Sequence, residues 1–93
     1  FNRRLPMVII DPIFMAELRK VFPRVSDNKI EIVTYFVYGM TCKDIAYHKG
    51  VSHQAVSKVL REFCEMYNIS KLDMVKAVYA VRLELYKHLR PAL

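Results

Sequence analysis

The chain has 93 residues, a length that favours one small domain with a modest core. Hydrophobic residues make up 54% of it, which excludes a disordered tail, yet its longest apolar stretches (7–10 and 33–38) are far shorter than the roughly 18–20 residues of a membrane span. Its 15 lysines and arginines outnumber 9 aspartates and glutamates, giving a formal net charge of +6 that favours an anionic partner such as a nucleic acid or a membrane surface.

The first eleven residues predict a basic arm or an extended segment. Arg3 and Arg4 could reach along DNA, as the basic arms of other DNA-binding proteins do, and a frayed terminus is the alternative. The short apolar run 7–10 fits either a strand or an extended segment packed on a partner subunit.

The rest of the chain predicts an all-α fold, a small bundle of about five helices that contains a helix-turn-helix. Asp11 and Pro12 are typical of a helix start, and Pro23 of its end. A second helix is expected from Ser26 to about residue 38, where Gly39 stops it. The residues expected to face the core from these two helices are Ile13, Phe14, Glu17, Leu18, Val21 and Phe22, then Ile30, Val33, Thr34 and Val37.

The helix-turn-helix is predicted over residues 41–67. Thr41, with Asp44 three positions later, resembles a capping box and starts a short helix from Cys42 to about residue 48. Gly50 can adopt the left-handed conformation that reverses the chain. We expect Val51 to fill the corner and Ser52 to cap a helix from residue 53 to about 67, which Asn68 then ends. Generic packing of a helical hairpin is the alternative.

The helix over residues 53–67 is the predicted recognition helix. One of its faces is apolar and is expected to face inward: Val56, Val59, Leu60 and Phe63. The opposite face is polar and is the candidate DNA-binding surface: Ser52, His53, Gln54, Ser57, Lys58 and Arg61. Gln54 can pair with adenine, and Lys58 and Arg61 with guanine or phosphate. The alternative is a solvated polar face with no ligand.

Basic residues outside this helix are candidates for contacts with backbone phosphates. Lys43 and Lys49 lie on the first helix of the motif. Further candidates are His48, Arg24 and Lys29, together with Arg3 and Arg4 of the N-terminal arm. A solvated charged face would explain the same residues.

The last helix, predicted over residues 70–90 with Ser70 and Asp73 as its cap, is apolar around most of its circumference. The apolar residues are Leu72, Met74, Val75, Val78, Tyr79, Val81, Leu83, Leu85, Tyr86 and Leu89. A surface helix needs only one buried stripe, so the surplus predicts a second covered face. We therefore expect a homodimer or higher oligomer, formed through this helix or through the N-terminal segment.

Enzyme chemistry finds little support in the sequence. There is no nucleophile with an obvious base, no glycine-rich phosphate loop and no convincing carboxylate pair. Cys42, His48, His53 and Cys64 lack the spacing of a structural zinc site. We expect no metal, no cofactor and no small-molecule ligand, and two cysteines fit a reducing cytoplasm.

The segment from Tyr35 to Ile45, followed by Gly50-Val51, Val56-Ser57 and Leu60-Arg61, resembles the PapB-type regulators of bacterial fimbrial adhesin operons. Residues 50–58 are also similar to KorA-type plasmid repressors, and residues 26–78 to the DNA-binding domain of LuxR-type regulators. The PapB resemblance implies a small oligomeric protein that controls adhesin genes by occupying AT-rich double-stranded DNA. The segment His53-Gln54-Ala55 departs from that family and looks like an ordinary major-groove reader.

The leading hypothesis is a cytoplasmic, nucleoid-associated transcription regulator that binds DNA sequence-specifically. One rival is a protein-interaction module that docks on another transcription component, with its basic charge incidental. Another is the C-terminal output domain of a longer LuxR-type protein.

Overall fold

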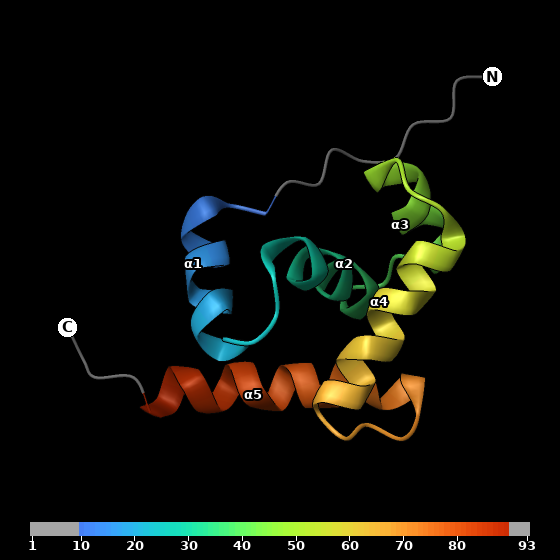
Figure 1. Cartoon of the computed structure of the whole chain (residues 1–93). Helices are drawn as coiled ribbons and strands as arrows, with labels where there is room; N and C mark the ends of the chain where they lie inside the picture. Colours follow the sequence, from blue (N-terminus) through green and yellow to red (C-terminus); the bar gives the residue numbers. More distant parts are fainter. Residues whose placement is uncertain (1–9, 90–93) are drawn as a thin grey trace.

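The computed structural model (Figure 1) describes residues 10–89, and this part of the chain is a bundle of helices without strands. The elements in order are α1 (Pro12–Val21), α2 (Asp27–Val37), α3 (Cys42–Lys49), α4 (His53–Met66), a short 3-10 helix (Leu72–Met74) and α5 (Val75–Leu89). The all-α bundle of five α-helices predicted from the sequence is confirmed. No helix within residues 10–89 has the length and apolar character to cross a membrane.

Helix α2 lies at the centre of the bundle. It contacts α1, α3, α4 and α5 (Figure 1). Its buried side chains are therefore more numerous than its 3.6-residue periodicity predicted: Ile30, Ile32, Val33, Thr34 and Tyr35. Ile32 and Tyr35 were not expected in the core, because a helix surrounded by others buries more than one stripe.

Aromatic rings connect the first, fourth and last helices. Phe22, directly after α1, stacks on Tyr79 of α5 at 5.2 Å between ring centroids and lies 5.6 Å from Phe63 of α4. Tyr67 meets Phe22 edge-on at 5.8 Å. Phe22, Phe63 and Tyr79 are buried, and their contacts hold α5 across the ends of α1 and α4 (Figure 1).

Helix α1 begins as predicted but packs differently along its first turn. The carboxylate of Asp11 accepts a hydrogen bond of 2.7 Å from the N–H of Ile13, so Asp11 is its N-cap. The side chain of Ile13 is 77% exposed, and its predicted place in the apolar stripe is wrong. The buried residues of α1, Leu18 and Val21, lie in its second half, so only this half of the helix packs into the core.

The start of the last helix also differs from the prediction. Ser70 does not cap it, because a 3-10 turn precedes α5, with Lys71 at the N-cap position and without a side-chain hydrogen bond. Asn68 adopts the predicted left-handed conformation (φ 56°), and Ile69 is buried with its N–H bonded to the carbonyl of Cys64 at 2.8 Å. Burying Ile69 sets the direction of the chain, and the tighter 3-10 turn then brings it into α5.

Candidate nucleic-acid interface

The turn between α3 and α4 has the local structure that its sequence predicts. The side chain of Thr41 accepts a hydrogen bond from the N–H of Asp44 at 3.1 Å, and Ser52 accepts one from Ala55 at 3.0 Å. Between them Gly50 is left-handed (φ 69°), and the N–H of Val51 bonds to the carbonyl of Ala46 at 3.0 Å. Both caps and the chain reversal are confirmed, so α3 and α4 form a helix-turn-helix.

One feature of this turn was predicted wrongly. Val51 does not fill the corner, since its side chain is 40% exposed. The buried residues of α3 and of the first turn of α4 are Ile45, Ala46 and Val56, at 0%, 8% and 0% exposed. The two helices thus supply the buried side chains on either side of the turn, and Val51 stays at the surface.

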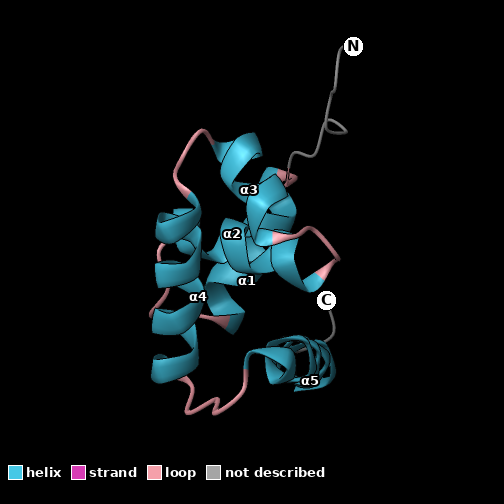
Figure 2. Ribbon diagram, turned by 90° about the vertical axis from the view of Figure 1, so that its right-hand side faces the viewer, coloured by secondary structure: helices cyan, strands magenta, loops and turns pink. Residues whose placement is uncertain are grey.

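Helix α4 separates its residues into an anchored face and an open face. Val56, Leu60 and Phe63 are at most 3% exposed and hold the helix in the core. The open face carries the predicted site residues: Ser52, His53, Gln54, Lys58 and Arg61 are exposed, and Ser57 is half-buried. Figure 2 shows that the turn before α4 and the loop leading to α5 lie at opposite ends of this helix. The structure therefore brings the predicted recognition residues together on one side.

Three cationic side chains near the turn have no partner in the described part of the chain. Lys43, Lys58 and Arg61 are exposed, and within residues 10–89 no ion pair or hydrogen bond holds them. They are the lysine and arginine side chains of α3 and α4 that remain available to an anion.

The other described residues that were predicted to contact phosphate interact with side chains or carbonyl groups of the protein itself. Lys49 pairs with the carboxylate of Glu31 on α2, and its side chain is only 19% exposed. Lys29 pairs with Glu62 at 3.0 Å, and Arg24 donates to the carbonyl of Met66 at 3.3 Å. His48 packs edge-on against the ring of Tyr35. Lys49, Lys29 and His48 thus join α2 to α3 or α4, and Arg24 joins the segment between α1 and α2 to the end of α4. Arg3 and Arg4 lie outside the described residues.

The second half of α4 is acidic where the first half is not. Glu62 and Glu65 follow Arg61, and the hydrogen bond from Lys29, with the charges of Lys58 and Arg61 adding to it, lowers the pKa of Glu62 despite some desolvation. Ionised carboxylates repel phosphate. The part of α4 whose charge favours an anion therefore ends near Arg61.

Tyr47 is a site candidate that the sequence analysis missed. Its side chain is 71% exposed at the end of α3, one turn after Lys43. The spacing of four residues places the two on the same side of the helix. A tyrosine in a short polar segment that ends in a glycine turn is the sequence feature that could have drawn attention to it.

Metal chemistry finds no cluster to support it. Within residues 10–89 no group of three or more histidine, cysteine, aspartate or glutamate side chains could hold an ion. Cys42 and Cys64 are free thiols, both half-buried.

No protein-family model, curated protein or solved structure matches the chain. The resemblance to PapB-type regulators therefore stays a prediction, and function has to be inferred from the geometry of the helix-turn-helix.

Proposed function

We propose that this protein binds double-stranded DNA sequence-specifically and regulates transcription, with the first half of α4 as its recognition helix. One observation carries the proposal: the exposed polar and cationic face of α4 lies opposite a fully buried face, directly after a tight turn at Gly50. A helix held in this way can enter a major groove without losing its contacts with the core.

The side chains of the open face divide by chemistry into two groups. Gln54, in the first turn, carries a donor and an acceptor that can pair with the edge of adenine. Lys58 and Arg61 lie one and two turns further along and can reach guanine or phosphate. Lys43 and the hydroxyl of Tyr47, from α3, would contact the backbone of the adjoining strand and set the docking angle.

Self-association is part of the proposal. Val81, Leu85 and Leu89 of α5 are 56%, 55% and 80% exposed, far more apolar surface than a single stripe against the core would leave. A two-fold dimer through this face would present two recognition helices to two half-sites. A cytoplasmic, nucleoid-associated regulator of a fimbrial adhesin operon that binds AT-rich sites is the specific form that the PapB resemblance suggests.

The test is a binding titration by fluorescence anisotropy with AT-rich and GC-rich duplexes at several salt concentrations. Lys58→Ala and Arg61→Ala should each weaken binding by roughly 1–3 kcal/mol where the residue meets a base, or reduce the salt slope by about 1 where it meets a phosphate. Gln54→Ala should narrow the difference in affinity between the two duplexes.

Lys76→Ala is the matched control. Lys76 is exposed on α5, outside the helix-turn-helix, and the substitution removes the same positive charge. Equal losses in all three charge variants would mean that only net charge matters. If neither Lys58→Ala nor Arg61→Ala weakens binding, the proposed docking face is wrong.

The exposed apolar face of α5 also favours a second candidate, a module that docks on another transcription component. Its binding to DNA would be weak, insensitive to sequence and lost at moderate salt, while a protein complex would persist. The same titration separates the two functions, since only a DNA reader discriminates between duplexes at moderate salt.

A further inference from the structure

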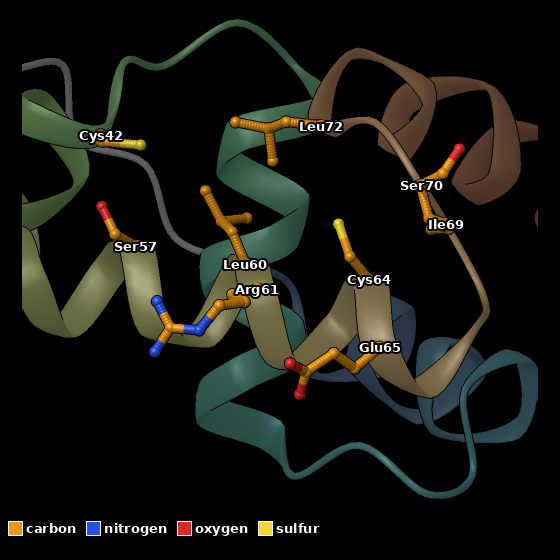
Figure 3. A pocket seen from close by; sticks show the side chains of 9 residues that line it. All are labelled: Cys42, Ser57, Leu60, Arg61, Cys64, Glu65, Ile69, Ser70 and Leu72. Carbon is orange, nitrogen blue, oxygen red and sulfur yellow. The ribbon is translucent and has the colours of Figure 1, made fainter.

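A cavity of about 360 Å³ opens on one side of α4. Figure 3 shows it between the start of α3, the middle of α4 and the segment 69–72 that leads to α5. The apolar residues of its lining are Leu60, Ile69 and Leu72, joined by the thiols of Cys42 and Cys64. Its volume lies in the range of roughly 300–1,000 Å³ typical of small-molecule sites.

The rest of the lining is polar: Ser70 of the segment 69–72, and three residues that follow one line along α4. Ser57, Arg61 and Glu65 are spaced four residues apart on α4, so their side chains succeed one another along the edge of the cavity (Figure 3). Arg61 lies in the middle and takes part in no ion pair or hydrogen bond within residues 10–89. The cavity thus combines apolar walls with an available guanidinium group.

The cysteines behave here as part of the apolar wall. Burial raises the pKa of Cys64, and the neighbouring carboxylate of Glu65 raises it further. A neutral thiol packs as a small apolar side chain. The thiol of Cys64 therefore adds no charge to the wall.

The charge around the cavity favours an anion at its other end. Lys58 and Arg61 are unpaired, whereas Glu62 is neutralised by Lys29. Glu65 lies one turn beyond Arg61 and would repel an anion at its own position. An acidic group would therefore lie between Ser57 and Arg61, where a hydroxyl and a planar guanidinium group can both donate to it.

We propose that this cavity binds a small apolar carboxylic acid, with its carboxylate on Arg61 and Ser57 and its apolar body against Leu60, Ile69 and Leu72. Arg61 and Ser57 also belong to the proposed DNA-binding face, so the bound acid competes with DNA for them. The binding site stands on its own geometry, whereas the competition rests on the proposed function.

The first experiment uses the whole chain without DNA. An NMR titration with 2-naphthoate should give saturable shifts of backbone amides at Cys42 and in residues 57–72. The neutral 2-naphthamide should bind about tenfold or more weakly, because it lacks the charge that pairs with Arg61. Arg61→Gln should weaken naphthoate binding by a similar factor and leave naphthamide binding unchanged. Lys76→Gln, which removes a charge on α5, should change neither.

The site would be overturned by equal affinities for the acid and the amide, by unchanged naphthoate binding in Arg61→Gln, or by shifts that map away from Cys42 and residues 57–72. A general effect of charge would instead lower naphthoate binding in Lys76→Gln as much as in Arg61→Gln, and this would also overturn it.

The second experiment adds naphthoate to the protein–DNA complex. Naphthoate should reduce the apparent DNA affinity in proportion to the occupancy of the cavity, and naphthamide should do so only at correspondingly higher concentration. If the protein binds both DNA and naphthoate without mutual effect, the competition is refuted. If it binds naphthoate but no DNA at all, the proposed function fails and the ligand site stands.

Discussion

The hydroxyl groups of Thr34 and Tyr79 lie 2.8 Å apart in the core and join α2 to α5 across 45 positions of the chain. Both side chains are almost completely buried, at 4% and 1% exposed. A buried hydroxyl without a partner costs free energy, so each residue depends on the other. This bond fastens the helix proposed for self-association to the centre of the bundle.

Replacing Tyr79 with Phe should lower the free energy of unfolding by about 1–3 kcal/mol, because the hydroxyl of Thr34 then stays buried without this partner. Urea denaturation measures the change. Thr34→Val combined with Tyr79→Phe should cost less than the sum of the two single substitutions, since the double variant leaves neither group unsatisfied. Strictly additive effects would show that the bond contributes nothing to stability.

The protein should lose stability at alkaline pH through Tyr79. Burial is the main cause that raises the pKa of Tyr79 from 10.0 to about 12, and the hydrogen bond with Thr34 acts in the opposite direction. Between these values tyrosine ionises in the unfolded chain but not in the folded protein, so rising pH favours unfolding. The stability of the parent protein should fall from pH 10 to 12, and Tyr79→Phe should show a shallower decline. Equal slopes would contradict this.

Glu31 should stabilise the junction of α2 and α3 only while it is ionised. Burial acts to raise its pKa, but hydrogen bonds from Lys49 and Tyr35 outweigh burial and lower it below 4.5. The stabilisation is therefore present above about pH 4.5 and is lost as the pH falls through the lower pKa of the folded state. Glu31→Gln should cost about 1 kcal/mol at neutral pH and progressively less in acid.

The matched control for this substitution is Glu84→Gln. Glu84 pairs with His88 at 3.5 Å, but both side chains are largely exposed, so little change in stability is expected at any pH. If both variants lose the same stability, burial of the Glu31 pair has no special effect.

The parts of the fold that the sequence predicted depend on neighbouring residues. The caps at Thr41 and Ser52 act on N–H groups three residues away, and the left-handed Gly50 needs only its own backbone. Interactions between residues so close along the chain can be predicted from the local sequence alone. The helix-turn-helix and the open face of α4 could therefore be found before the structure.

The parts that were missed depend on contacts between distant segments. Lys49 is 18 positions from Glu31, and Arg82 donates to the carbonyl of Val21 from 61 positions away. A lysine with an acidic partner and a lysine open to phosphate have the same local sequence, so only the packing of α3 on α2 distinguishes them. The cavity beside α4 is likewise created by the segment 69–72, whose path depends on the burial of Ile69.

The apolar face of α5 gives the last prediction. Val81, Leu85 and Leu89 recur four residues apart on α5, and their exposed fractions are 56%, 55% and 80%. Replacing Leu85 with Glu should leave the fold intact, since this side chain lies outside the core. It should convert a dimer into a monomer, because dimerisation would bury the new carboxylate without a partner.

Sedimentation equilibrium measures the state of association, and circular dichroism checks the fold. Ala80→Glu is the matched control. Ala80 is exposed on α5 but does not belong to the apolar face, and the substitution adds the same negative charge. If the parent protein is a dimer, Leu85→Glu should also weaken its binding to DNA with two half-sites far more than to DNA with one. Only the duplex with two half-sites binds both recognition helices of a dimer at once and so gains affinity from dimerisation. A parent chain that sediments as a monomer, or a Leu85→Glu variant that still dimerises, would exclude this face as the interface.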